Sequence, residues 1–506
     1  MVSDQAEAGG LIRLLDEEQR LFDLLLRVVD ECNLSTELRC AGGWVRDKLL
    51  GKESSDIDIA LDNMMGEDFA ERLNEYLVSH GEEGTSVAVI QSNPEKSKHL
   101  ETAKVKFRGL EIDLVNLRSE AYASTSRIPT IEFGTAEQDA MRRDFTVNAL
   151  FYNIKHGTVE DLTKHGLSDL RKGLLRTPLP AHQTFMDDPL RVLRAIRFAS
   201  RLDFELHSDI AVAGSSEDVR TALDTKVSRE RITAEFEATL QGPDPKAGLL
   251  LIDSFGILDI VLGLPEAVRS ELKRPYHKQC IHTALAFHDV LRTREEGLPS
   301  AFHVKIGLLA ALLLPLRNVA VEGAVKKKAI KAPEYVVGFV LKRKKEAAMV
   351  SDLHAAAVTM SGLSQSIGDV SEVGDEYKVA LGLAIRQAKD NWGLAVALAF
   401  TLGFDFSEAI AEVGDAKRAA RVWSEVSATE AQEYVRQYRE AVVSLKLDRA
   451  WTMKPMLNGK EVMQLLGVSG PQVGKIINGL INWQLAHPHA TAEECKRWLL
   501  EANPRD

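Results

Sequence analysis

Residues 56–61, DIDIAL, constrain the fold more than any other stretch, because their alternation is typical of a strand with one acidic and one apolar face. Asp56 and Asp58 share one face, and Ile57, Ile59 and Leu61 share the other. The backbones of two such aspartates are about 7 Å apart on a strand, so their oxygens can converge on one metal ion. A bare Asp-x-Asp pair is more often a solvated sheet face. Like charges repel, however, and a divalent cation converts that repulsion into binding energy.

A diglycine turn precedes this strand. Residues 37–41, ELRCA, have the pattern of a strand that runs into Gly42 and Gly43, and WVRDKLL reads as a short helix that ends at Gly51. Backbone N–H groups at a glycine turn and a helix start can hold an anion. An anion site directly before an acidic strand favours a functional site over a solvated sheet face.

A second strand, LEIDLVNLR at 110–118, places Glu111, Asp113 and Val115 on one face. Pairing beside the first strand would bring a third carboxylate to the metal site, and periodicity alone does not choose between Glu111 and Asp113. Three carboxylates that hold two Mg²⁺ ions, beside a turn for phosphates, make a site for in-line phosphoryl transfer. One ion lowers the pKa of an attacking hydroxyl and the other stabilises the leaving pyrophosphate. The predicted reaction class is nucleotidyl transfer.

The order of patterns along the 506 residues predicts an α+β protein with a small mixed sheet. Strand-like and helical segments mix from 37 to 178, and from about 182 onward almost everything has helical periodicity. The apolar stretches at 306–316 and 392–404 are shorter than the roughly 18 residues of a membrane span, so we expect buried helices there. The net charge of -11 argues at first against a nucleic-acid partner, but segments 190–201, 325–331 and 341–346 are locally basic.

Five motifs, in order, give the chain a resemblance to a known family. GGWVRD followed by DIDIAL resembles the first motif of the class II polymerase-β-like nucleotidyltransferases, which include the CCA-adding enzymes and bacterial poly(A) polymerases. RRDFTVNAL (142–150) is similar to the family's ribose-recognition motif, and DDPLRVLRAIRFAS (187–200) to its base-reading helix. DLTKHGLSDLRKGLLRTP (161–178) resembles the linking motif, and VSRERITAEFEATL (227–240) the motif that steadies the base-reading helix.

The resemblance implies roles for particular residues, position by position. The catalytic carboxylates and metal ligands would be Asp56, Asp58 and Asp113, with two Mg²⁺ ions as the cofactor. Among the nucleotide-binding residues, Gly43 and Arg46 would contact the triphosphate, with Gly42 supporting the turn, and Arg143 and Asp144 would meet the phosphate and ribose. Asp188 and Arg191 would read the base, and Arg194 and Arg197 continue that cationic face.

The spacing of residues 188–197 supports the implied role in base recognition. Asp188, Arg191, Arg194 and Arg197 follow one another at steps of three, so on a helix they form one slowly turning stripe. A carboxylate paired with a guanidinium offers acceptors and donors that match the hydrogen-bonding edge of a base. Such an amino-acid template would select nucleotides without a nucleic-acid template. The alternative is a solvated charged helix face.

Residues 118–141 have small polar side chains, a proline and little periodicity, so we predict a mobile loop. In the family that this chain resembles, such a loop helps to switch specificity from C to A. Arg118, Arg127 and Glu132 are the candidates for that role, and a passive connection is the alternative.

The resemblance also implies a domain order and a function. We expect a catalytic head at 1–178, a neck for base recognition at 179–265, a helical body at 266–400 and a helical tail that binds tRNA at 401–506. The implied activity is the addition of C, C and A to the 3′ end of tRNA from CTP and ATP, by a monomer without a membrane partner.

Three alternatives stay open. A poly(A) polymerase of this class usually carries a basic GRRF-like signature soon after the aspartate pair, whereas ALDNMMGEDFAERL follows here. A partial enzyme would add only CC or only A. An inactive tRNA-binding protein would keep the fold alone, although all three candidate carboxylates are present.

The N-terminal residues, MVSDQAEAGGLIRLLDEEQR, have no apolar signal core and too many acidic residues for an arginine-rich transit peptide. Cytoplasm or nucleus is therefore the predicted location. Mitochondrial delivery stays open in case a presequence has been removed.

Overall fold

The computed structural model describes residues 12–54, 56–82, 86–90, 102–121, 130–272, 276–293, 298–325, 328–367, 370, 373–403 and 416–503. The chain divides into two compact units, Met1–Phe236 and Glu237–Asp506. The finer division into head, neck, body and tail stays a prediction.

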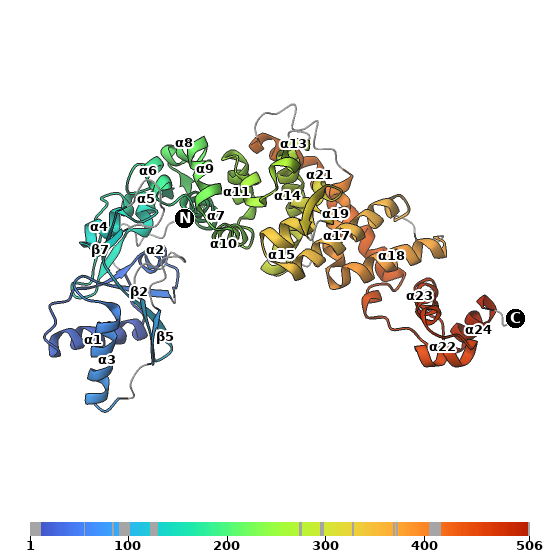
Figure 1. Ribbon diagram of the computed structural model, residues 1–506, viewed down its shortest axis with the longest axis horizontal. Helices are drawn as coiled ribbons and strands as arrows, with labels where there is room; N and C mark the ends of the chain where they lie inside the picture. Colours follow the sequence, from blue (N-terminus) through green and yellow to red (C-terminus); the bar gives the residue numbers. More distant parts are fainter. Residues whose placement is uncertain are drawn as a thin grey trace. The chain divides into compact units, whose positions relative to one another are not determined.

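A mixed sheet forms the centre of the first unit, and its strand order in the described residues is β3-β4-β5-β2-β1-β8-β9 (Figure 1). Strands β2 and β5 run parallel, and the other neighbouring pairs are antiparallel. This sheet confirms the predicted α+β class. Its strands are β1 (Leu38–Ala41), β2 (Asp56–Leu61), β3 (Ser86–Ile90), β4 (Thr102–Phe107), β5 (Leu110–Asn116), β8 (Phe151–Asn153) and β9 (Thr158–Glu160).

The two faces of strand β2 differ, as its alternation predicted. Ile57, Ile59 and Leu61 are at most 1% exposed. The parallel register places Leu114 of β5 beside Ile59, on this apolar face. Helix α3 (Gly66–Ser79) begins beside Leu114. A Cβ on Gly66 would come within 2.4 Å of the Leu114 carbonyl oxygen, so the start of the helix packs directly against β5. Helical packing therefore covers the apolar face, and Asp56 and Asp58 lie on the opposite one.

The described residues of segment 118–141 are largely regular, so the prediction of a loop is wrong for them, and the mobility of the segment stays a prediction. Strand β6 (Arg118–Ala121) pairs antiparallel with β7 (Thr130–Phe133), and helix α4 (Ala136–Met141) follows. A capping box starts this helix, because Thr135 and Gln138 exchange side-chain to backbone hydrogen bonds of 2.8 and 3.2 Å. Residues 122–129 lie outside the described part of the chain.

Helices make up most of the rest of the first unit. Helix α1 (Asp16–Glu31) precedes the sheet, and the short helix α2 (Gly43–Leu49) joins β1 to β2. A parallel pair, β10 (Leu174–Leu175) and β11 (Glu205–Leu206), lies among the later helices. These are α5 (Gly166–Lys172), α6 (Ala181–Asp187), α7 (Arg191–Leu202), α8 (Ser208–Gly214), α9 (Glu217–Lys226) and α10 (Arg229–Leu240).

The second unit is predominantly helical (Figure 1). Both apolar stretches are buried helices, as predicted: every residue from 304 to 313 of α15 and from 394 to 401 of α19 is buried. In the described residues no helix is both long and apolar enough to cross a membrane. The longer helices are α11 (Pro245–Ser254), α14 (Tyr276–Arg292), α15 (Ala301–Leu313), α17 (Lys344–Leu363), α18 (Asp375–Ala388), α19 (Trp392–Leu402), α21 (Ala416–Ser444), α22 (Gly459–Leu466), α23 (Pro471–Ala486) and α24 (Ala492–Ala502).

The basic segment 325–331 departs from the helical pattern predicted for this half of the chain. Strand β12 (Ala320–Val325) pairs antiparallel with β13 (Lys328–Lys331), so Lys328 and Lys331 lie on a strand. Alternate residues of a strand point to opposite sides, and periodicity over seven residues does not separate a short strand from a helix.

Candidate active site

The glycine turn between β1 and α2 has the strained geometry that only glycine adopts readily. Gly42 is the N-cap of α2 with φ +70° and ψ -123°. A Cβ at this position would meet Arg143 Nη1 at 2.9 Å and the Asn148 carbonyl oxygen at 3.5 Å. The turn therefore packs against Arg143 and Asn148 of the RRDFTVNAL motif (142–150). It lies at the start of α2, where backbone N–H groups have no partners within the helix.

Helix α2 ends as the sequence predicted. Gly51 has φ +69°, its N–H donates to the Lys48 carbonyl at 3.0 Å, and the Lys52 N–H donates to the Asp47 carbonyl at 2.8 Å. This is the hydrogen-bond pattern of a Schellman motif. The abrupt end lets the chain turn directly into β2 and its aspartates.

The parallel register of β2 and β5 brings the carboxylates together on one face of the sheet. Asp58 lies beside Asp113, and Asp56 lies beside Glu111. The Glu111 side chain is 64% exposed and forms a 2.7 Å ion pair with Lys106, whereas Asp113 is 22% exposed. The lower exposure of Asp113 therefore favours it over Glu111, and its role as the third carboxylate stays a prediction.

The electrostatics of this face fit a divalent cation. Burial raises the pKa of Asp58 to about 6, helped by the negative charges of Asp56 and Asp113 and opposed by Arg143 and Lys104. Carboxylate oxygens are the ligands that hard cations such as Mg²⁺ prefer. In the part of the chain that the structure describes, no three His, Cys, Asp or Glu side chains stand at metal-coordinating spacing. Both oxygens of Asp113 accept hydrogen bonds from Lys104 Nζ instead, at 2.6 and 2.8 Å.

Arg143 stands between the glycine turn and the carboxylates. Its Nε and Nη2 donate to Asp139 Oδ2 at 2.9 and 2.8 Å, and its guanidinium lies 5.0 Å from the centre of the Phe151 ring. Asp139 is 1% exposed, and although burial favours its neutral form, the charges of Arg143 and Arg142 hold its pKa below the usual value. Asp139 thus positions Arg143, the residue that we predicted to contact the nucleotide phosphate.

Arg46, predicted at the triphosphate, is only 3% exposed. Its guanidinium donates to both oxygens of Asp47 at 2.8 and 2.9 Å and to Asn148 Oδ1 at 2.5 Å. It also lies 5.2 Å from the centre of the Phe198 ring. Arg46 therefore links α2 to Asn148 and to Phe198 of α7. Direct contact between Arg46 and a phosphate stays a prediction.

Asp144, which is buried, and Arg194, whose side chain is 32% exposed, form an ion pair between the RRDFTVNAL motif (142–150) and α7. Arg194 Nε and Nη2 donate to Asp144 Oδ2 at 2.8 and 2.6 Å, and Asn148 Nδ2 donates to Asp144 Oδ1 at 3.1 Å. Burial alone would raise the pKa of Asp144, but the Arg194 charge and these hydrogen bonds hold it below the usual value. Asp144 is therefore anionic, and part of its acceptor capacity is committed within the protein.

Asp188 does not lie on the helix that carries the three arginines, so the predicted stripe of four residues is wrong. Helix α6 ends at Asp187, Asp188 has extended φ and ψ of -137° and 99°, and α7 begins at Arg191. Pro189 explains the break, because the residue before a proline avoids the helical region. The pair that was expected to read the base is therefore a loop carboxylate and the first residue of a helix.

Both members of this pair are held by neighbouring elements. Asp188 accepts from Arg231 of α10 at 2.7 Å, and Arg191 Nη2 donates to the Arg142 carbonyl at 2.6 Å. Arg197 Nε donates to Glu235, also on α10, at 2.5 Å. Helix α10 thus contacts the base-reading segment, as the fifth motif implied.

Several residues with these supporting roles escaped the sequence reasoning. Readable signals existed for two of them: the Thr135–Gln138 capping box marks α4, which carries Asp139, and the alternation of β4 puts Lys104 and Lys106 on one face. The contacts of the others depend on which segments meet in the fold. The residues are Lys104, Asp139, Asn148, Arg231 and Glu235.

Of the candidates for the specificity switch, Arg118 is the best described. Its N–H donates to Asp139 Oδ1 at 3.3 Å, so β6 is tied to the carboxylate that holds Arg143. Arg127 lies outside the described residues, as does the side chain of Glu132.

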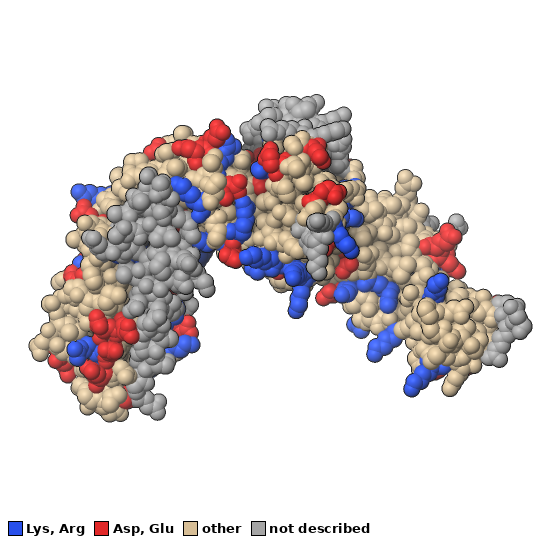
Figure 2. All heavy atoms as spheres, in the orientation of Figure 1, with Lys and Arg blue, Asp and Glu red and all other residues tan. Residues whose placement is uncertain are grey.

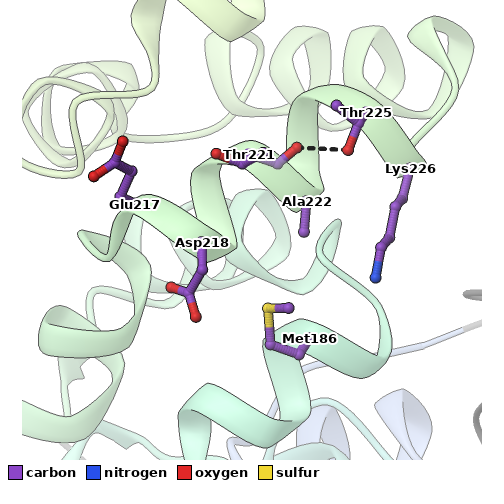
Figure 3. A pocket seen from close by; sticks show the side chains of 7 residues that line it. All are labelled: Met186, Glu217, Asp218, Thr221, Ala222, Thr225 and Lys226. Carbon is purple, nitrogen blue, oxygen red and sulfur yellow. Dashed lines mark hydrogen bonds between the residues drawn. The ribbon is translucent and has the colours of Figure 1, made fainter. Parts of the chain in front are cut away.

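A cavity of 440 Å³ is lined by residues of α6 and α9 (Figure 3). It is lined by residues such as Met186, Asp218 and Lys226, and none of the predicted site residues lines it. The carboxylates, the glycine turn and the arginines of α7 therefore remain the candidate active site.

The chain is similar to known proteins in sequence and in fold. A family model described as the poly A polymerase head domain matches residues 38–176. The mitochondrial CCA tRNA nucleotidyltransferase of Saccharomyces cerevisiae is 36% identical, with 96% of this chain and 92% of that protein covered. A solved structure of a CCA-adding enzyme in apo form II has a TM-score of 0.64 at 18% identity, covering 97% of both chains. The Thermotoga maritima CCA-adding enzyme complexed with tRNA has a TM-score of 0.59 at 18% identity, covering 99% of this chain and 98% of that one.

The structural neighbours establish the fold, and the yeast relative extends the likeness to sequence over nearly the full length of both proteins. The chain therefore belongs to the class II CCA-adding tRNA nucleotidyltransferases of the polymerase-β-like superfamily.

Proposed function

We propose that this chain adds C, C and A, without a nucleic-acid template, to the 3′ end of tRNA from CTP and ATP. The observation that carries the proposal is the register that sets Asp58 beside Asp113, with Asp56 on the same sheet face. The glycine turn packs against Arg143, which acts electrostatically on Asp58. A phosphate-binding turn and a set of metal-binding carboxylates thus meet in one place.

The residues of this chain have distinct roles in the proposed reaction. The 3′-hydroxyl of tRNA attacks the α-phosphate, and pyrophosphate leaves. Asp56, Asp58 and Asp113 would hold two Mg²⁺ ions, which when bound lower the pKa of the attacking hydroxyl and neutralise charge on the phosphates. The Gly43 N–H at the glycine turn and the Arg143 guanidinium orient the triphosphate, whereas the Gly42 N–H donates to the Leu150 carbonyl at 3.1 Å.

Base selection is assigned to the segment between α6 and α7. Asp188 offers acceptors and Arg191 offers donors, so together they match the edges of cytosine and adenine. Arg231 and the Arg142 carbonyl hold these two side chains at 2.7 and 2.6 Å. Arg194 and Arg197 are committed to Asp144 and Glu235, so we assign them the role of positioning the segment.

The second unit offers a basic surface that suits an RNA backbone. A cavity of 640 Å³ is lined by Phe339 and the run 342–346, which contains four lysine or arginine residues. Figure 2 shows basic side chains gathered on the second unit near α15 and α17. Duplex RNA is recognised through phosphates and 2′-hydroxyls, which favours tRNA contact here.

One assay separates the proposed activity from its alternatives. Labelled CTP and ATP are offered separately and together to tRNA that lacks its last three nucleotides. Addition of C, C and A followed by arrest supports the proposal. A long A tail would identify a poly(A) polymerase, addition of C alone or A alone would identify a partial enzyme, and no incorporation would identify an inactive binder.

Location and assembly are proposals of the same kind. Because the yeast relative is named as mitochondrial, we propose a mitochondrial share beside the cytoplasm and nucleus expected from the N-terminal residues. Cell fractionation with an antibody to the protein tests this.

We also propose that the protein is a monomer. Light scattering after gel filtration would show a doubled mass if this is wrong.

A further inference from the structure

Asp113, the third carboxylate of the candidate site, forms an ion pair with Lys104. Lys104 Nζ lies 2.6 Å from Oδ1 and 2.8 Å from Oδ2 of Asp113. Both oxygens that would bind a metal are therefore engaged by one ammonium group. The Lys104 side chain is 45% exposed, so water can replace its contact if it moves away.

The contact follows from the hairpin that joins β4 to β5. Arg108 and Gly109 form its two-residue turn with φ of +47° and +93°, as a type I′ turn requires. A two-residue turn sets the register, which places Lys104 opposite Asp113 and Lys106 opposite Glu111. With β2 on the far side of β5, a row runs across three strands from Lys104 through Asp113 to Asp58.

We propose that Lys104 is a positioning residue that holds Asp113 in the metal-free protein and is displaced by the entering divalent cation. This inference rests on the proposed function, because it takes Asp113 as a metal ligand. In the absence of metal, the ammonium offsets the repulsion among the carboxylates of Asp56, Asp58 and Asp113. Metal binding must then break the two hydrogen bonds, so Lys104 weakens the affinity of the free protein for the cation.

The neighbouring pair supplies a matched control. Lys106 Nζ lies 2.7 Å from Glu111 on the same two strands, and these side chains are 67% and 64% exposed. Removing Lys106 changes the net charge as much as removing Lys104 does. Because the Lys106 pair is largely solvated and Glu111 is not an assigned ligand, screening by water and salt limits its influence on the metal.

The experiment measures Mn²⁺ binding to the full-length protein without nucleotide or tRNA, by electron paramagnetic resonance at about 0.15 M salt. We expect Lys104→Met to tighten Mn²⁺ binding by at least about fivefold, because one cation close to the site no longer competes. Lys106→Met should change the dissociation constant by less than about twofold. Lys104→Arg restores the charge and the paired donors, so its affinity should return toward that of the wild type.

The outcomes separate failure of this inference from failure of the proposed function. Equal effects of Lys104→Met and Lys106→Met, or weaker Mn²⁺ binding by Lys104→Met, would overturn the role of Lys104 while the metal site stands. Absence of Mn²⁺ binding to the wild type would overturn both. Circular dichroism of each variant establishes that it is folded, and Mg²⁺ should raise the melting temperature of Lys104→Met more than that of the wild type.

Discussion

Replacing Gly42 by alanine tests whether the glycine turn and Arg143 act as one phosphate-binding unit. The backbone of Gly42 has φ +70° and ψ -123°, which L side chains rarely adopt, so the substitution should cost about 1–3 kcal/mol of stability. A domain of this size loses roughly 2–4 °C in melting temperature per kcal/mol, so we expect a decrease of about 2–12 °C.

The new methyl group should affect activity more than stability. It would lie 2.9 Å from Arg143 Nη1, the end of a flexible side chain, so the guanidinium can move aside. Arg143 would then leave its place beside Asp58, and kcat/KM for CTP and ATP should fall at least about tenfold, equivalent to roughly 1.4 kcal/mol of transition-state stabilisation. Steady-state incorporation into tRNA lacking its CCA end measures this fall.

Gly51→Ala is the matched control for backbone strain. Gly51 has φ +69°, and a Cβ there would meet nothing within 4 Å. This variant should lose about 1 kcal/mol of stability and keep its kcat/KM. The reasoning is refuted if Gly42→Ala stays fully active, or if Gly51→Ala loses as much activity as Gly42→Ala does.

Three further predictions concern the carboxylates, the base pocket and the second unit. Asp56→Ala or Asp58→Ala should abolish incorporation and leave tRNA binding intact in a filter-binding assay, and retained activity would remove these residues from the metal site. Arg191→Ala should blur the choice between CTP and ATP more than it weakens tRNA binding, and unchanged selectivity would count against the amino-acid template. Burial lowers the pKa of His354 to about 4, below its unfolded value of 6.5, so the stability it contributes is complete above pH 6.5 and is lost as the pH falls toward 4. We expect unfolding of the second unit at pH 5 to be easier by about 2 kcal/mol than at pH 8, and His354→Gln should flatten this part of the pH profile in denaturant titrations.

Local patterns in the sequence determined the elements that the site is built on. The alternation of residues 56–61 correctly separated an acidic from an apolar face, and Gly51 correctly marked the end of α2. The buried helices α15 and α19 were also readable, from the apolar stretches that overlap them. Each of these features depends on residues that are close in the chain, where the periods of helix and strand are strict. The ordered motifs between 37 and 240 identified the family for the same reason.

Local reasoning failed where its signals were weak or were overlooked. The proline at 189 could have shown that Asp188 is outside the helix, and the capping box at Thr135 could have shown α4 inside the supposed loop. Strand β6, RSEA, has no apolar alternation to reveal it, and the alternation of TIEF in β7 covers only four residues.

Only the tertiary structure decided how the functional side chains meet. Periodicity left Glu111 and Asp113 equivalent, and the parallel register of β2 and β5 set Asp113 beside Asp58. The antiparallel register of β4 and β5 gave Lys104 its contact with Asp113, and the packing of α2 against α7 buried Arg46. Strand register and helix packing join residues far apart in the chain, and they depend on the burial of whole faces that no single segment encodes.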